Sequence, residues 1–295
     1  MKMNENITTL QEVVSCFPAR KQDSHKGDYG KALLSVGSYG MCGAAVMAAA
    51  ACTRSGAGLV RVAVPQCIYP IAAPALPDAV FLPLQQNEQG SISASQMKEL
   101  IAAAEQSDAV LFGCGCRNNI DTEMLVRALC AQELRLILDA DGINALHRDI
   151  NVLRDSSADL ILTPHVGEFS RLTGCSAEKI AENRVRLAGE FAVQNQVVLV
   201  LKGYHTVIAA PDGRIRINPT GNPGMARGGS GDVLAGILTA LVAQGIPSFE
   251  AAVSAVYLHG MAGDLAAQRR SQQAMLASDL IDSLCEVFLK IESER

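Results

Sequence analysis

Short apolar segments that suit buried strands alternate with helix-like segments along most of the chain. The expected strands cover residues 32–36, 59–64, 80–84, 109–112, 136–138, 160–162 and 197–201. The expected helices between them cover residues 44–55, 97–104, 125–130 and 177–194. Strands that alternate with helices predict an α/β protein with a parallel, doubly wound sheet.

The C-terminal third has a different pattern. Residues 206–210 and 215–218 flank Pro211-Asp212-Gly213, which predicts a β-hairpin, and helices are expected over 233–243, 249–268 and 276–291. Residues 1–25 are expected to form a helical or extended lead-in. Because no linker is visible after it, residues 26–295 are expected to form a single domain.

Charge and cysteine content exclude several classes of protein. The 295 residues carry a formal net charge of −5 without a basic stripe, which argues against a nucleic-acid partner. No apolar stretch is convincing as a membrane span, and residues 1–10 lack the apolar core of a signal peptide, so we expect a cytoplasmic protein without a membrane partner. The nine cysteines are scattered, so free thiols are expected rather than disulfides or a zinc site.

Polar residues or glycines follow successive expected strands at their C-terminal ends. These segments are residues 37–38, 113–115, 139–144, 164–168 and 202–206. In open α/β sheets, ligands bind outside the carboxyl ends of the strands. The chain is therefore expected to build one shared site from several loops.

The run from Gly221 to Gly236 reads GNPGMARGGSGDVLAG and leads into an apolar helix. A glycine-rich turn before a helix aims several N–H groups at one point, which predicts an anion site suited to phosphate. A carboxylate at Asp232 disfavours anion binding, so proton transfer is the better interpretation of this residue. The alternative is an ordinary helix start that is capped by Ser230 or Asp232.

Several ordered motifs together resemble the ribokinase-like superfamily and, within it, the ADP/ATP-dependent NAD(P)H-hydrate dehydratases. The motifs are residues 26–30, 43–44, 54–59, 138–141, 162–168, 202–203 and 222–232. The resemblance implies a three-layer αβα sandwich with a mostly parallel central sheet. Many family members carry an epimerase domain ahead of this one. Only about 25 residues precede the first expected strand, so that domain is expected to be absent.

The resemblance also implies an activity. Such enzymes repair hydrated nicotinamide cofactors: they remove water from the S form of NADHX or NADPHX and restore NADH or NADPH. ADP is the expected phosphate donor, with AMP and phosphate released and Mg²⁺ as cofactor; ATP stays open as the donor. A homo-oligomer is implied, since family members are commonly tetramers. The alternative is a superfamily kinase that acts on a vitamin precursor alcohol of the thiamine-precursor type.

The resemblance assigns roles to particular residues of this chain. Asp232 would be the catalytic base, beside an anion hole at Gly229, Ser230 and Gly231. Ala44, Gly115 and His165 would line the hydrated-cofactor pocket together with Asp232. The nucleotide would contact Lys202, Gly203, Tyr204, His205, Thr206 and Gly231. Asn218 and Asn222 would position the loop ahead of the anion hole, and the residues that hold a metal are left open.

Some residues at the expected site allow two interpretations. Glu168 either caps a helix or lies near Mg²⁺, and Arg227 either strengthens phosphate binding or points to solvent. Asp139 and Asp141 are expected to support the substrate loop rather than to act in catalysis.

Cys114 and Cys116 depart from the family pattern, which usually has a Gly-Pro-Gly turn here. Without that proline the loop at Gly115 is expected to be looser.

Overall fold

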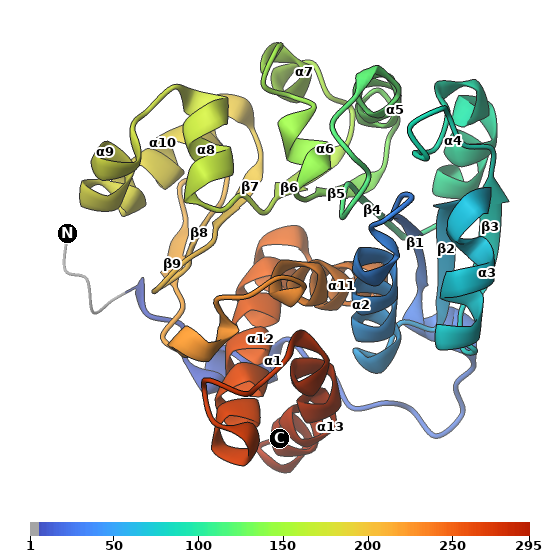
Figure 1. Cartoon of the computed structure of the whole chain (residues 1–295). Coiled ribbons are helices and arrows are strands. Elements are labelled where there is room, and N and C mark those ends of the chain that lie inside the picture. Colours follow the sequence, from blue (N-terminus) through green and yellow to red (C-terminus); the bar gives the residue numbers. More distant parts are fainter. Residues whose placement is uncertain (1–5) are drawn as a thin grey trace.

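A mostly parallel nine-stranded sheet forms the centre of the computed structural model, which describes residues 6–295 (Figure 1). The strands are β1 (Lys31–Ser35), β2 (Leu59–Pro65), β3 (Val80–Leu84), β4 (Ala109–Phe112), β5 (Arg135–Leu138), β6 (Asp159–Leu162), β7 (Val198–Leu201), β8 (Val207–Ala209) and β9 (Ile215–Ile217). Their order in the sheet is β3-β2-β1-β4-β5-β6-β7-β8-β9, and β7, β8 and β9 pair antiparallel. The predicted α/β class and the hairpin after β7 are confirmed.

Helices cover both faces of this sheet. They are α1 (Leu10–Ser15), α2 (Cys42–Arg54), α3 (Tyr69–Ala72), α4 (Met97–Glu105), α5 (Ile120–Cys130), α6 (Asp141–Asn144), α7 (Asn151–Arg154), α8 (Val166–Thr173), α9 (Ala177–Glu182), α10 (Arg184–Asn195), α11 (Ser230–Ala243), α12 (Ser248–Arg270) and α13 (Ala277–Ser293). One core cluster joins α1, α2, α11, α12 and α13 to the sheet, and a second joins α4, α5, α8 and α10 to its other face. The protein therefore has the predicted three layers.

The central strands are buried on both faces. Along β1, Leu33 faces one core cluster and Leu34 faces the other, because successive side chains of a strand point to opposite faces. Parallel strands covered on both sides read as continuous apolar runs, which is why these segments were predictable from sequence.

Helix α11 lies against α2 at very short range (Figure 1). A Cβ atom on Gly236 would lie 2.1 Å from the carbonyl oxygen of Ala48, so only glycine allows this approach. The helix begins at Ser230, three residues earlier than predicted, and all of its residues from Val233 to Ala243 are buried. Close packing against α2 thus fixes the position of the α11 N-terminus.

The prediction of one long helix over 177–194 was wrong. The chain forms two helices, α9 and α10, because Asn183 adopts φ −129° and ψ 26° between them. Its side-chain amide donates to the Lys179 carbonyl at 3.2 Å, a local bond that competes with helical pairing. Arg184 then turns toward β7 and donates to the carbonyls of Leu201 and Tyr204.

The described part of the N-terminal lead-in, residues 6–25, packs on the domain. The Thr8 N–H donates to the Ile217 carbonyl of β9, and Val13 and Val14 of α1 are buried. Within residues 6–295, no helix combines the length and the apolar character that spanning a bilayer requires.

Candidate active site

The C-terminal ends of the central strands meet the N-terminus of α11. Gly113, Cys114 and Gly115 follow β4, Asp139 follows β5, Thr163 follows β6, and Lys202 follows β7. The strand ends are tied together: the Lys202 N–H donates to the Pro164 carbonyl at 2.8 Å. The expected shared edge is therefore present, and α11 closes one side of it.

The N-terminus of α11 has the geometry of an anion site. Its N-cap is Gly229, with φ of +90°, and no side chain caps the helix. The alternative in which Ser230 or Asp232 is the cap is therefore wrong. The first N–H groups of a helix have no intrahelical acceptors, so those of Gly231 and Asp232 can bind a phosphate.

A histidine that the sequence analysis did not select supports this turn. His259 of α12 is buried, and its Nε2 lies 3.3 Å from the Ser230 hydroxyl. Burial lowers the pKa of His259 to about 4, so the ring is neutral near pH 7 and bonds Ser230 without adding charge. His259 belongs to the pattern His-Gly-x-x-Gly-Asp in the middle of the alanine-rich helix α12, which could have served as a signal.

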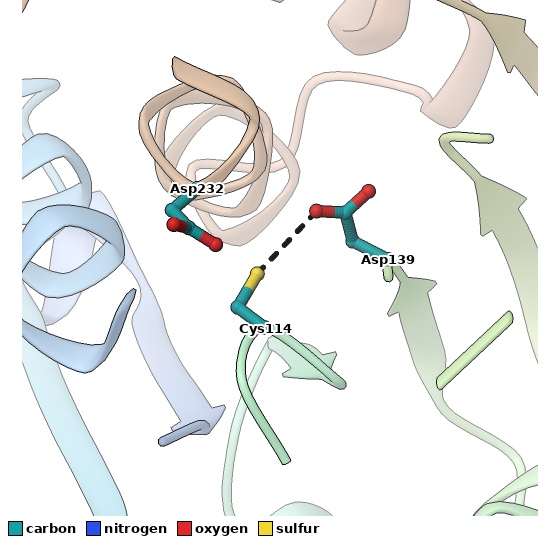
Figure 2. A group of neighbouring side chains, drawn as sticks. All are labelled: Cys114, Asp139 and Asp232. Atoms are coloured by element: carbon teal, nitrogen blue, oxygen red, sulfur yellow. Dashed lines mark hydrogen bonds between the residues drawn. The ribbon is translucent and has the colours of Figure 1, made fainter. Parts of the chain in front are cut away.

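Asp232 points from the first turn of α11 toward Cys114 and Asp139 (Figure 2). Burial raises the pKa of Asp232 to about 6, and the charge of Asp139 acts in the same direction. The Cys114 thiol and the Lys202 ammonium favour the charged form and oppose this rise. A carboxyl group with a pKa near 6 can hold and release a proton close to neutral pH.

Asp139 connects three strand ends. Its Oδ1 accepts from the Lys202 ammonium and from the Thr163 hydroxyl, each at 2.6 Å. Its Oδ2 accepts from the Cys114 thiol at 3.5 Å. The expectation that Asp139 supports only the substrate loop is therefore too narrow, because its carboxylate pairs with a predicted nucleotide-binding residue.

A cavity of about 720 Å³ opens beside the anion site. Its lining includes every residue predicted to bind the nucleotide: Lys202, Gly203, Tyr204, His205, Thr206 and Gly231. Ser230 and His165 also line it. Lys202 thus lies between this cavity and the buried carboxylate of Asp139.

Two residues predicted to bind the hydrated cofactor lie outside this cavity. A Cβ on Gly115, which has φ of +67°, would lie 2.9 Å from the Ala44 Cβ, so the two residues are in contact. Gly115 directly follows Cys114, whose thiol lies near Asp232. Ala44 and Gly115 are therefore separate from the cavity that the predicted nucleotide residues line, whereas His165, also predicted to bind the substrate, lines that cavity.

The loop ahead of the anion turn is held by side chains. Asn218 and Thr220 bond each other at 3.0 Å, and Asn222 accepts from the Gly224 N–H. Asp264 of α12 accepts from the Gly221 N–H and from the Asn222 amide, each at 3.0 Å. Asp264 was not selected from the sequence, although it ends the same His-Gly-x-x-Gly-Asp pattern.

His165 is the N-cap of α8, a helix that the sequence analysis did not predict. Its Nδ1 accepts from the N–H groups of Gly167 and Glu168, and Glu168 accepts in return from the His165 N–H at 2.8 Å. The capping interpretation of Glu168 is therefore confirmed. This cap fixes the His165 ring at the rim of the cavity.

The outer wall of the cavity carries an exposed aromatic pair. Tyr204 is 84% exposed, and its ring centroid lies 4.0 Å from that of His205. Arg184 holds this turn by donating to the Tyr204 carbonyl at 2.6 Å. A flat apolar group, such as a nucleotide base, could stack on this pair.

Arg227 lies just ahead of the anion turn and lines the cavity together with Ser230 and Gly231. Its guanidinium donates to the carbonyls of Gly224 at 3.2 Å and Gln273 at 3.1 Å. The side chain therefore links the loop after β9 to the segment between α12 and α13. Because Arg227 also lines the cavity, its contribution to phosphate binding stays a prediction.

Comparisons with known proteins show the family of this chain. A family model described as NAD(P)H-hydrate dehydratase matches residues 32–286. The ADP-dependent (S)-NAD(P)H-hydrate dehydratase of Bacillus subtilis is 35% identical over 290 residues, which cover 98% of this chain and 100% of that protein. The bifunctional NAD(P)H-hydrate repair enzyme of Moorella thermoacetica is 42% identical over 292 residues, which cover 99% of this chain and 55% of that protein. The chain thus spans about half the length of several curated relatives it matches.

The fold comparison points the same way. A crystal structure of the Bacillus subtilis ADP/ATP-dependent NAD(P)H-hydrate dehydratase, co-crystallized with ATP/Mg²⁺, matches with a TM-score of 0.82. The identity is 32%, and the match covers 97% of this chain and 98% of that one. The predicted family is confirmed: this chain belongs to the NAD(P)H-hydrate dehydratases.

Proposed function

We propose that this chain dehydrates the S form of NADHX and NADPHX to NADH and NADPH, with ADP as phosphate donor and AMP and phosphate as products. The observation that carries the proposal is the position of Asp232. Its carboxyl group, with a pKa raised to about 6, lies in the first turn of α11 directly beside the anion-binding N–H groups.

The chemistry follows from a poor leaving group. Hydroxide leaves a carbon slowly, whereas phosphate leaves readily. Asp232 would take the proton of the substrate hydroxyl. The oxygen of that hydroxyl would attack the β-phosphorus of ADP, and the bond between that phosphorus and the oxygen of AMP would break. The turn at Gly229–Gly231 would hold the transferred phosphoryl oxygens. Loss of phosphate and of one ring proton then restores the double bond of the reduced nicotinamide.

The side chains of Cys114, Asp139 and Asp232 are a poor ligand set for Mg²⁺, the expected cofactor. Among residues 6–295, Cys114, Asp139 and Asp232 place ligand atoms within 4.8 Å of one another. Mg²⁺ prefers oxygen ligands, and the group offers a thiol and a carboxylate already paired with Lys202. These side chains therefore form no magnesium cage. Mg²⁺ commonly binds through the phosphates of a nucleotide, and no step above depends on it.

The proposal extends to a homo-oligomer in the cytoplasm. All nine cysteines are free thiols, which agrees with a reducing compartment.

The first test is the near-ultraviolet absorbance of NADHX mixed with the purified chain, Mg²⁺ and either ADP or ATP. We expect a rise that requires ADP, because the dihydronicotinamide ring is restored only when water is lost. A rise with ATP alone would correct the donor. No rise with either nucleotide, using verified substrate and folded protein, would contradict the proposal, and a stable phosphorylated alcohol would then favour the precursor kinase.

The rate is expected to depend on pH through Asp232. The base must be ionised to accept the substrate proton, and its pKa is raised to about 6 by burial and by Asp139. The kcat should therefore be constant near pH 8 and fall about tenfold per pH unit below pH 6. Saturating both substrates at each pH isolates kcat, and a profile that stays flat to pH 5 would contradict the assignment.

A further inference from the structure

A buried polar network centred on Asp139 lies behind the proposed base. Asp139, which is 2% exposed, receives the Lys202 ammonium and the Thr163 hydroxyl on one oxygen and the Cys114 thiol on the other. Asp232 lies across the thiol from Asp139, with ligand atoms of the three side chains within 4.8 Å (Figure 2). The network thus touches both the predicted nucleotide site and the base.

The ion pair orients Lys202. A lysine side chain has four rotatable bonds, so it needs a partner to hold one direction. The Asp139 carboxylate holds the ammonium beneath the α11 turn, where a Cβ on Gly231 would lie 3.4 Å from the Lys202 Nζ. Burial disfavours the charged ammonium, but Asp139 and Glu168 outweigh it and raise the pKa of Lys202. The positive charge is therefore kept where phosphate would bind.

Charged and titratable groups reach Asp232 from three neighbouring loops. They are Cys114 and Cys116 after β4, Asp139 and Asp141 after β5, and Lys202 after β7. Burial and the carboxylates of Asp139 and Asp232 raise the pKa of the Cys114 thiol, so the thiol stays protonated and acts as a donor. The nearest negative charge that opposes ionisation of Asp232 is that of Asp139.

We propose that Asp139 is a positioning residue for the reaction: it holds Lys202 beneath the phosphate-binding turn and faces Asp232 with a second negative charge across the Cys114 thiol. The inference rests on the proposed function. It adds that a single buried carboxylate serves both the nucleotide site, through Lys202, and the base, through its charge.

The test is Asp139→Asn in the full chain, with kcat and the KM for ADP measured from pH 5 to 9. Removing the negative charge makes Asp232 easier to ionise, so the acid limb of kcat should move down by about one pH unit. Releasing Lys202 should raise the KM for ADP about tenfold. A uniform fall of kcat at every pH with an unchanged KM would overturn the proposal, because it describes a merely structural role.

Thr163→Val is the matched control. It removes a hydroxyl donor from the same Asp139 oxygen but keeps the carboxylate charge. The acid limb of kcat should therefore stay at its wild-type pH. A shift equal to that of Asp139→Asn would show that packing, rather than charge, sets the profile.

The Kd for ADP in the absence of the second substrate, measured by titration calorimetry, tests the Lys202 contact without the reaction. In the Lys202→Met background, Asp139→Asn should leave the Kd for ADP unchanged, because its effect passes through Lys202. Independent, multiplying effects would overturn the proposal. The double variant also keeps the test available if Asp139→Asn alone fails to fold around an unpaired ammonium. If the wild type is inactive but the effects of Asp139 and Lys202 on the Kd for ADP are still coupled, the proposed function is contradicted, whereas the role of Asp139 in holding Lys202 is supported.

Discussion

Asp232→Asn should lower kcat by about 10²- to 10⁴-fold while ADP binds at least as tightly as before. Asparagine keeps the size of the side chain but cannot accept the hydroxyl proton. The substitution also removes a negative charge beside the anion turn, which favours a bound phosphate. The measurements are kcat from the near-ultraviolet absorbance of the product and the Kd for ADP from titration calorimetry.

Asp141→Asn provides the comparison for this variant. Asp141 is a partly buried carboxylate at the start of α6, where it accepts from the Arg117 N–H at 2.8 Å. Its loss should cost less than about tenfold in kcat. Near-normal turnover of Asp232→Asn would refute the base assignment, and equal losses in both variants would point to a general effect of charge.

The shared edge of the site was predictable from sequence, but its pairings were not. The order of motifs placed Asp139 and Lys202 at strand ends, since apolar runs marked β5 and β7 clearly. Their ion pair depends on the position of β6, which lies between those strands and brings Thr163 to the same oxygen. Such a contact between residues 63 positions apart follows from sheet order rather than from any local pattern.

Sequence patterns did not predict helix α8 or the break between α9 and α10. Helix α8 begins at Val166 and its N-cap is His165, whereas Ser, Thr, Asp and Asn are the usual N-caps, so the sequence did not mark this helix start. The sequence over 177–194 predicted one helix through Asn183, whereas the non-helical backbone of Asn183, together with its side-chain bond to Lys179, separates α9 from α10. In both places hydrogen bonds of a side chain to the backbone determined where a helix starts or stops.

The contribution of α12 was missed for a different reason. Its alanine-rich sequence indicates a buried structural helix, and most of it is one. His259 and Asp264 nevertheless reach the anion turn and the loop ahead of it. Two polar residues and two glycines in a buried helix were the available signal, because buried polar groups require partners.

The packing that fixes the anion turn should be sensitive to a single methyl group. We expect Gly236→Ala to lower the free energy of unfolding by about 2 kcal/mol, because the added Cβ would lie 2.1 Å from the backbone oxygen of Ala48. Helix propensity alone predicts the opposite sign, a gain of about 1 kcal/mol for alanine over glycine. Urea unfolding of the two proteins measures which effect is larger.

Gly228→Ala is the matched control, since a Cβ there meets no atom within 4 Å and the residue precedes the same helix. It should leave the free energy of unfolding nearly unchanged. If Gly236→Ala is also neutral, α2 and α11 can separate without cost, and their contact does not fix the N-terminus of α11. If it destabilises as expected and also raises the KM for ADP, the glycine contact positions the anion site as well as the core, because a shift of α11 away from the new methyl group would move the turn at Ser230 with it.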